Sequence, residues 1–311
     1  MQRNRKLCVF VVGVLAATTM STIAPTSAVS ASGAAECRPW RASTLTSGLG
    51  TLENLSFDRR GGLLLSAGSF GGSGSILRLT ASGKKRTVVP DVAGPGGHVV
   101  VGDRLFFTSG NGFADGVTAE FGRRTGRLNV VDLHTGKVRV LARNLAMPNG
   151  LVRLPDGSFL TSRDVGFPGR TTRIHPDGRQ SIFAPSVTST NGMAVDEERR
   201  LVYIVSTFNP TSTISVVDLD RHLAQPRVIT LAGLGPANSA DELVLGRDGQ
   251  LYVTLNVAGQ VVRVDPDSGR ACTIATGIPF ASSLRFGAGR GWDPRSLYVT
   301  SFAGTVTRLR P

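Results

Sequence analysis

Polar residues recur where successive hydrophobic strands begin in this chain. They are, in order, Glu53, His98, Asn149, Asn191 and Asp241, with Ser283 as a weaker sixth. Their positions lie 45, 51, 42, 50 and 42 residues apart. If each repeat returns to one central axis, two carboxylates meet two amide carbonyls there. Such an all-oxygen set carries two negative charges that repel each other, so the pattern predicts a divalent cation at the axis.

The nature of the ligands narrows the choice of ion. Carboxylate and amide oxygens with room for water favour calcium, with magnesium or manganese as alternatives and zinc less well suited. Glu53, Asn149, Asn191 and Asp241 are the candidate metal ligands. His98 belongs to the same series, and a catalytic or ligand role stands beside the more ordinary one of a hydrogen-bonded wall residue.

Each polar residue also has an ordinary explanation when taken alone. Asn149 and Asn191 each precede a glycine, and Asn-Gly is a common turn signal. Asp241 stands before a strand, where it could cap a loop. The recurrence of all of them at one register is what favours a shared site.

The elements that would position these residues are short strands. Each start opens a strand, turn, strand segment, as in ADELVLGRDGQLYVT at 240–254, and a second strand pair follows. A period of roughly 40 to 50 residues with four strands per unit is typical of a β-propeller. Six starts predict six blades, an all-β fold without a helix of ordinary length.

The last repeat ends after its third strand, which leaves one outer strand missing. Residues 40–47, WRASTLTS, precede the first blade and are expected to supply that strand. This arrangement would close the ring and cover an exposed sheet edge. Cys37 would then lie beside the outer strand of the fifth blade, which contains Cys272, so the two are predicted to form a disulfide. Two free buried thiols are the alternative.

Consecutive strands of a blade run in opposite directions. The polar residues that begin the first strands and the loops that follow the second strands are therefore expected at the same mouth of the ring. The longest of these loops runs from Gly110 to Arg124, and two shorter ones cover Arg163 to Thr171 and Thr207 to Thr213. They could form a lid over the channel.

The first residues are expected to be a secretory signal. Residues 1–31 combine a basic start, an apolar run from Leu7 to about Met20 and small residues near Ala28 and Ala31. The apolar run is too short to span a membrane. Residues 32–39 would be a linker and 40–311 the propeller, giving a secreted protein in which a disulfide is stable.

Charge and missing motifs exclude several functions. The formal net charge is +13, and the arginines are scattered without interleaved aromatic residues, so nucleic-acid binding is not expected. Weak association with an anionic cell envelope is compatible with this charge. No nucleophile elbow, CxxC, HExxH or phosphate loop occurs. We expect a monomer that binds a small-molecule substrate.

Over roughly residues 45 to 311 the chain resembles the senescence-marker-protein, gluconolactonase and luciferin-regenerating-enzyme family of six-bladed propellers, which includes regucalcin. The match rests on Glu53, on Asn149, on Asn191 followed by glycine, and on Asp241, 50 residues after Asn191. The resemblance implies that Glu53, Asn191 and Asp241 hold the divalent cation. It also implies that Asp241 is the general base and that Asn149 contacts metal-bound water or substrate.

One departure concerns the substrate. Many gluconolactonase-like members carry Arg-x-Asn-Asp where this chain has Met147-Pro148-Asn149-Gly150. Met147 at a substrate-binding position favours a hydrophobic or differently shaped substrate over a sugar-acid lactone. The resemblance therefore implies a secreted metal-dependent hydrolase of a lactone or related ester. The alternative is a non-catalytic propeller that binds a ligand or an envelope component and keeps a structural cation.

Overall fold

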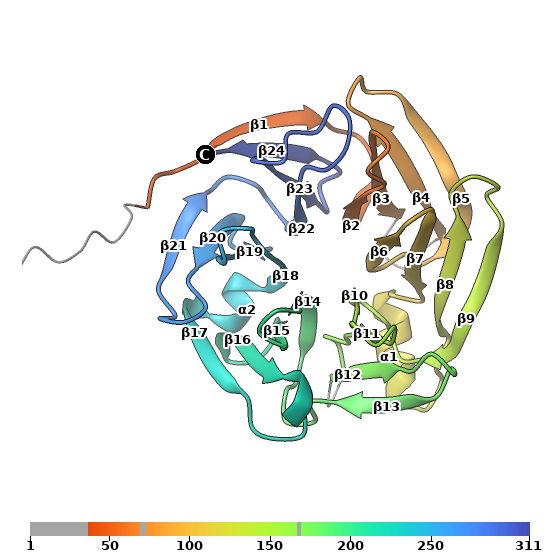
Figure 1. Ribbon diagram of the computed structural model, residues 1–311, viewed down its shortest axis with the longest axis vertical. Helices are drawn as coiled ribbons and strands as arrows, with labels where there is room; N and C mark the ends of the chain where they lie inside the picture. Colours follow the sequence, from red (N-terminus) through yellow and green to blue (C-terminus); the bar gives the residue numbers. More distant parts are fainter. Residues whose placement is uncertain (1–36, 69–72, 167–168) are drawn as a thin grey trace, which may run out of the picture. The chain divides into compact units, whose positions relative to one another are not determined.

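A computed structural model describes residues 37–311 with the exception of 69–72 and 167–168. The signal segment expected at 1–31 and most of the linker lie outside the described residues. Residues 37–311 form one compact unit. Its strands make six four-stranded antiparallel sheets arranged around a central axis (Figure 1). The six-bladed propeller expected from the sequence is confirmed.

Each blade consists of four consecutive strands except the last. Blade 1 contains β2 (Thr51–Phe57), β3 (Gly62–Gly68), β4 (Ser73–Thr80) and β5 (Lys85–Ala93). Blade 2 contains β6 (His98–Val101), β7 (Arg104–Ser109), β8 (Gly126–Asp132) and β9 (Val138–Leu145). Blade 3 contains β10 (Leu151–Arg153), β11 (Phe159–Thr161), β12 (Thr171–Ile174) and β13 (Gln180–Phe183). Blade 4 contains β14 (Thr190–Asp196), β15 (Leu201–Ser206), β16 (Thr211–Asp218) and β17 (Arg227–Leu234). Blade 5 contains β18 (Ala240–Leu245), β19 (Leu251–Leu255), β20 (Gln260–Val264) and β21 (Ala271–Ala275).

Blade 6 joins the two ends of the fold. It contains β22 (Ala281–Phe286), β23 (Leu297–Ser301), β24 (Val306–Arg310) and, as its outer strand, β1 (Arg41–Thr46). β1 pairs antiparallel with β24, with Arg41 opposite Arg310. Cys37 forms a disulfide with Cys272 on β21. The predicted ring closure and the predicted cysteine pair are both confirmed.

The helices are short and lie in connections between strands. They are α1 (Phe113–Glu120), the single turn α2 (Gly235–Asn238) and the 3-10 turn Leu219–Arg221. α1 lies in the segment that the sequence assigned to a loop, because Gly116 obscured its helical pattern. A Cβ at Gly116 would come within 2.5 Å of the Met147 sulfur, so glycine lets the helix approach that side chain. Among the described residues no helix is long and apolar enough to cross a membrane.

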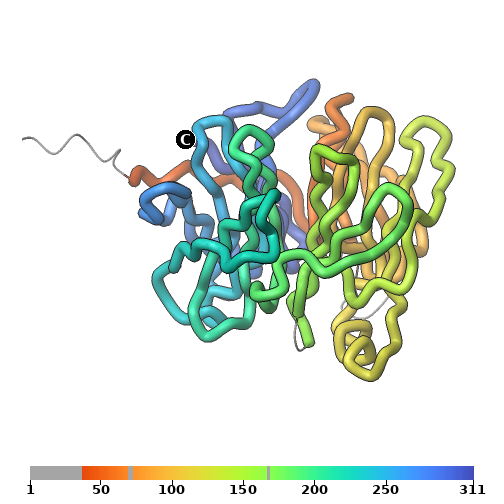
Figure 2. The backbone as a smooth tube through the Cα atoms, turned by 60° about the horizontal axis from the view of Figure 1, so that its bottom comes forward, coloured from red at the N-terminus to blue at the C-terminus, as the bar shows by residue number. Residues whose placement is uncertain are grey.

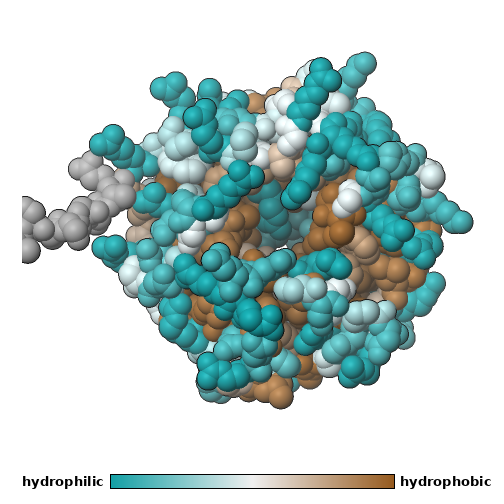
Figure 3. Space-filling view, viewed as in Figure 1, coloured by the Kyte–Doolittle hydropathy of each residue, from teal (hydrophilic) through white to brown (hydrophobic). Residues whose placement is uncertain are grey.

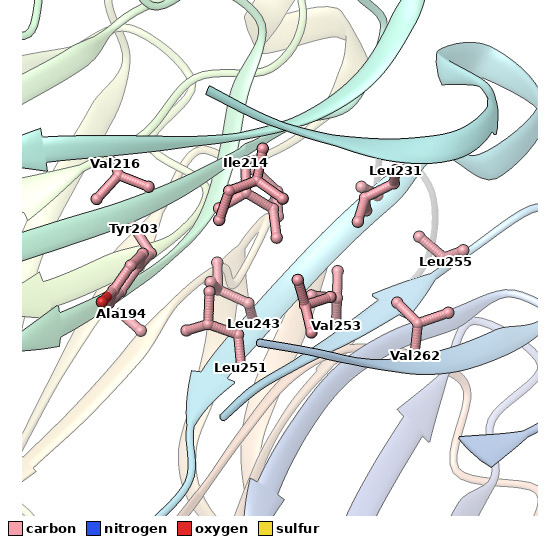
Figure 4. Packing of buried hydrophobic residues seen from close by; sticks show 14 residues of the cluster. Ala194, Tyr203, Ile214, Val216, Leu231, Leu243, Leu251, Val253, Leu255 and Val262 are labelled. Atoms are coloured by element: carbon pink, nitrogen blue, oxygen red, sulfur yellow. The ribbon is translucent and has the colours of Figure 1, made fainter. Parts of the chain in front are cut away.

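The hydrophobic core lies between neighbouring blades. Between blades 4 and 5, Tyr203, Leu243 and Leu251 are fully buried in one cluster of aliphatic side chains (Figure 4). At the seam between blades 6 and 1, Phe57 packs against Trp292, with ring centroids 5.3 Å apart. The closing seam is therefore packed like the others, which holds the ring rigid around its channel.

Hydroxyl groups link adjacent blades close to the channel. The side chains of Ser66, Thr108 and Thr254, at the ends of second strands, donate to the backbone carbonyls of Gly96, Asn149 and Ser282 in the next blade. These bonds are 2.6, 3.2 and 3.1 Å long. They fix the start of each following inner strand, which is where the functional side chains sit.

Candidate active site

The register of the inner strands defines one equivalent position in every blade. In blades 1, 4, 5 and 6 the pairing of the first two strands shifts across two residues near the start of the first strand. We call the position of the first of those two residues the axial position, and the same position exists in blades 2 and 3. The axial residues are Glu53, Gly96, Asn149, Asn191, Asp241 and Ser282. The four residues predicted to form a metal site are therefore structurally equivalent.

His98 and Ser283 do not occupy the axial position. His98 pairs with Phe107 and stands two residues beyond Gly96, at the level of Leu243 in blade 5. Ser283 stands one residue beyond Ser282. The predicted shared register is wrong for both, because their blades place a small residue, Gly96 or Ser282, at the axis.

The structure places His98 away from the site. It is 2% exposed, and its Nε2 lies 2.8 Å from the Ser66 hydroxyl. Burial lowers the pKa of His98 to about 3, and the charge of Arg285 adds to this. It is a neutral, hydrogen-bonded wall residue that borders the opposite end of the channel.

A left-handed backbone turn introduces the axial residue in five blades. Two positions before it, φ is positive at Gly94, Met147, Ser189, Ser239 and Phe280, with values from 44° to 56°. Four of these five are not glycine. A positive φ is energetically unfavourable for a residue that has a side chain. The turn directs the following side chains toward the channel, and such strain is typical of binding sites.

Four of the six axial residues line a cavity of about 360 Å³ at one mouth of the channel. Glu53, Asn149, Asn191 and Asp241 all border it. Asn149, Asn191 and Asp241 are buried, whereas Glu53 is half-buried. α1 projects beside this mouth and appears in yellow at the bottom of Figure 2. The structure brings these four predicted residues together, and Met147 also lines the cavity.

Four further polar residues of the cavity were not singled out from the sequence. Asn111, Asp164, Thr207 and Asn256 all border it. Each follows the second strand of its blade within three residues. The signal was present in the sequence, since loops after second strands were expected at this mouth, but their conformations are set by tertiary contacts.

Amide groups hold the carboxylates in place. Asn191 Nδ2 donates to Asp241 Oδ1 at 2.9 Å, and Asn256 Nδ2 donates to Asp241 Oδ2 at 2.8 Å. Asn111 Nδ2 donates to Glu53 Oε1 at 3.0 Å. Both oxygens of Asp241 are thus oriented by donors from two blades.

Three carboxylates influence one another inside the cavity. Burial, followed by the charge of Asp164, raises the pKa of Glu53 to about 8. Burial and the charges of Glu53 and Asp164 raise the pKa of Asp241 well above its ordinary value. The pKa of Asp164 is raised as well, mainly by burial. The cavity therefore favours protons or a cation over free carboxylates.

The residues present fit a divalent cation. In the described part of the chain, no three His, Cys, Asp or Glu side chains lie close enough to hold an ion by themselves. Amide oxygens would have to complete the coordination, and the Oδ1 of Asn111 is buried without a hydrogen-bond partner among the described residues. Paired carboxylates with amide oxygens are a donor set of the calcium or magnesium type.

The rim of the cavity is apolar. Phe113 of α1, Phe208 and Phe280 contribute to its lining and are 65%, 50% and 51% exposed. Met147 is buried against Gly116 at the base of α1. A polar floor beneath an aromatic rim suits a ligand with one polar reacting group and an apolar body.

A buried ion pair links the inner strands of blades 5 and 6 below the cavity. Glu242 follows Asp241, and its Oε2 accepts from Asn54 Nδ2 at 2.9 Å and from Arg285 Nη2 at 3.1 Å. The side chain of Glu242 is 4% exposed. These three residues, Asn54, Glu242 and Arg285, are called the waist here and come from the neighbouring blades 1, 5 and 6.

Comparison with known proteins agrees with the fold. A family model described as the SMP-30/Gluconolactonase/LRE-like region matches residues 159–303. No curated protein matches the sequence. A gluconolactonase from Xanthomonas campestris is 19% identical, with a TM-score of 0.68 over 88% of this chain and 91% of that one.

Two other solved structures have the same fold. A luciferin-regenerating enzyme is 13% identical, with a TM-score of 0.65 over 88% of this chain and 95% of that one. A virginiamycin B lyase from Staphylococcus aureus is 12% identical, with a TM-score of 0.58 over 88% and 99%. At these identities the likeness concerns the fold.

Proposed function

We propose that this chain, a six-bladed propeller that carries an SMP-30/Gluconolactonase/LRE-like region at residues 159–303, is a lactonase-type hydrolase. The observation that carries the proposal is the convergence of Glu53, Asn149, Asn191 and Asp241 in one cavity. The gluconolactonase among the similar structures supports the same reaction class. We propose further that the enzyme depends on a divalent cation.

Glu53, Asn191 and Asp241 would hold that cation, as the resemblance implies, and Asn149, which borders the same cavity, is a fourth candidate ligand. When bound, it would polarise the substrate carbonyl and stabilise the developing oxyanion. Calcium fits the oxygen donors best, with magnesium and manganese as alternatives and zinc the least suited of the four.

Asp241 is the proposed general base. Its carboxylate, oriented by Asn191 and Asn256, would take a proton from water while the water oxygen bonds to the carbonyl carbon. The ring C–O bond then breaks, and the proton on Asp241 passes to the leaving alkoxide. The products are a hydroxy acid and the unchanged enzyme, so atoms and charges balance. Asn149 would position the water or the substrate.

The substrate that suits the rim is a lactone with an aliphatic or aromatic body. No basic side chain borders the cavity in the described part of the chain. The phenylalanines of the rim offer apolar surface instead, worth roughly 25 cal/mol for each Å² that the ligand covers. This agrees with the replacement of the family arginine by Met147.

The test is hydrolysis of a lactone panel with aliphatic, aromatic and sugar members, followed by pH-stat titration. Protein stripped with chelator should be inactive and regain activity with calcium, and apolar lactones should react faster than gluconolactone. Asp248→Asn, an exposed carboxylate outside the cavity, is the matched control for Asp241→Asn. No turnover of any member with any divalent cation would refute the enzyme proposal and leave the binding propeller.

We also propose that the protein is exported. The disulfide between Cys37 and Cys272 supports this, since such bonds persist in oxidising compartments. Mass spectrometry of protein recovered from the culture medium should find a mature N-terminus near residue 32. Intact residues 1–31 on a protein retained inside the cell would contradict it.

A further inference from the structure

The mouth opposite α1 opens into a funnel of about 1020 Å³. Figure 3 views this face and shows a hollow at the centre of the ring, with apolar side chains inside and hydrophilic ones around it. Part of the apolar wall consists of half-buried residues of inner strands. They are Val99, Val152, Val244 and Phe286.

Arginines dominate the charge of this funnel. Six of them contribute to its lining, together with two carboxylates, Glu197 and Asp248. The arginines are Arg59, Arg153, Arg247, Arg263, Arg285 and Arg295. They come from blades 1, 3, 5 and 6, so positive charge surrounds the opening.

Four of the six guanidinium groups have no carboxylate partner among the described residues, and the exceptions are Arg285 with Glu242 and Arg295 with Asp293. Within the described chain Arg59, Arg153 and Arg247 are exposed and form no ion pair, unlike Arg78, which binds Asp58 at 2.6 Å. The carboxylate of Asp248 is engaged by the hydroxyl of Tyr252 at 2.8 Å. Positive charges that surround a concave surface raise the local concentration of anions there.

Arg285 is less exposed than the arginines of the rim. Arg285 lies at the base of the funnel with its side chain 20% exposed, and it is held by Glu242 of the waist. The charge of Arg285 is balanced by Glu242, so an anion that entered the funnel would meet a basic rim above apolar walls. The planar fork of arginine matches the two oxygens of a carboxylate or phosphate.

We propose that the funnel is a second binding site, for a small organic anion that carries a phosphate or carboxylate group on an apolar body. The rim arginines bind the oxyanion and the valines with Phe286 cover the body. The cavity beside α1 does not compete for this ligand, since three carboxylates border it.

The experiment is isothermal titration calorimetry in chelator at low salt, with four probes: 1-naphthyl phosphate, 1-naphthoate, 1-naphthol and inorganic phosphate. The funnel variant is Arg153→Gln with Arg247→Gln. The control is Arg86→Gln with Arg139→Gln, which removes equal charge from exposed positions on the outer strands β5 and β9. Thermal melts confirm that both variants fold.

At least one naphthyl anion should bind the parent. Its Kd should be roughly tenfold or more higher for the funnel variant. For the control its Kd should stay within about twofold of the parent value. Whichever anion binds more tightly identifies the preferred group. Absence of binding, an equal loss in both variants, or equal affinity for naphthol or inorganic phosphate would overturn the proposal. The titration uses no lactone and no metal, so its result is independent of the proposed hydrolysis.

Discussion

The two mouths of the channel carry opposite charge and are built from the same repeated strands. At the α1 mouth three carboxylates, Glu53, Asp164 and Asp241, meet above the waist. At the other mouth arginines surround the funnel, and the histidine of the wall stays neutral. The Glu242–Arg285 pair marks the boundary, with its carboxylate and its guanidinium drawn from neighbouring blades.

This difference shows how a repeated scaffold acquires chemistry. Each inner strand presents an axial residue at one end and a turn at the other, so a substitution at one end of a strand changes one mouth and not the other. Acidic and amide residues gather at the strand starts, where left-handed turns aim them inward. Basic residues gather near the far ends and in the following turns, where side chains are more exposed.

The largest expected effect is on turnover. Asp241→Asn removes the proposed base while keeping the side-chain volume, and we expect kcat to fall by roughly 10²- to 10⁴-fold on the best lactone. Arg153→Gln at the funnel should leave kcat within about twofold. Initial-rate kinetics measure both, and full activity of Asp241→Asn would remove this residue from the mechanism.

The aromatic rim should decide which lactones are preferred. Phe113→Ala with Phe280→Ala is expected to lower kcat/KM by roughly tenfold or more for aliphatic and aromatic lactones, because lost apolar contact weakens binding. The value for gluconolactone should change little. An equal loss for all substrates would mean that the two phenylalanines shape the site without selecting for apolar groups.

Removal of cations should reveal the unfavourable burial and repulsion of the carboxylates at the acidic mouth. The pKa of Glu53 is about 8 in the fold against an ordinary 4.5. The metal-free folded chain thus keeps a proton that the unfolded chain releases, and stability falls as pH rises from 4.5 through 8. Denaturant melts in chelator should show a slope of up to about 1.4 kcal/mol per pH unit. Glu53→Gln should make the slope shallower, because Asp241 and Asp164 still contribute their own raised pKa values. An unchanged slope would contradict the shift of Glu53.

His98 should give the opposite dependence on pH. Its pKa is about 3 in the fold against an ordinary 6.5. The unfolded chain binds a proton that the folded chain refuses, so stability is lost as pH falls from 6.5 toward 3, again by up to about 1.4 kcal/mol per unit. Melts of His98→Gln between pH 4 and 7 should lack this contribution. Activity at pH 7 should stay near that of the parent.

Much of the scaffold could be predicted because its signals are local and repeated. The six blades, the closing strand and the Cys37–Cys272 pair follow from strand periodicity and from the count of strands in the last repeat. The axial residue was found in the four blades where it is a carboxylate or an amide. The error at His98 arose because Gly96 occupies the axis there, and the first polar side chain appears two residues later.

The remaining site residues depend on long-range structure. Asp164 and Asn111 lie in loops whose course is fixed by contacts with α1 and with neighbouring blades, such as the ion pair between Arg163 and Glu120. The helix itself was missed because glycine at position 116, which packing against Met147 requires, weakens its local pattern.

The central claim is that the acidic mouth holds a divalent cation, and thermal unfolding tests it most directly. Chelator-stripped protein is melted with and without saturating calcium, beside Glu53→Gln and the control Asp248→Asn. A ligand at 100 times its Kd adds about 2.7 kcal/mol, so Tm should rise by roughly 5 °C or more in the parent and in Asp248→Asn, and by far less in Glu53→Gln. Absence of any shift with calcium, magnesium, manganese or zinc would contradict the account.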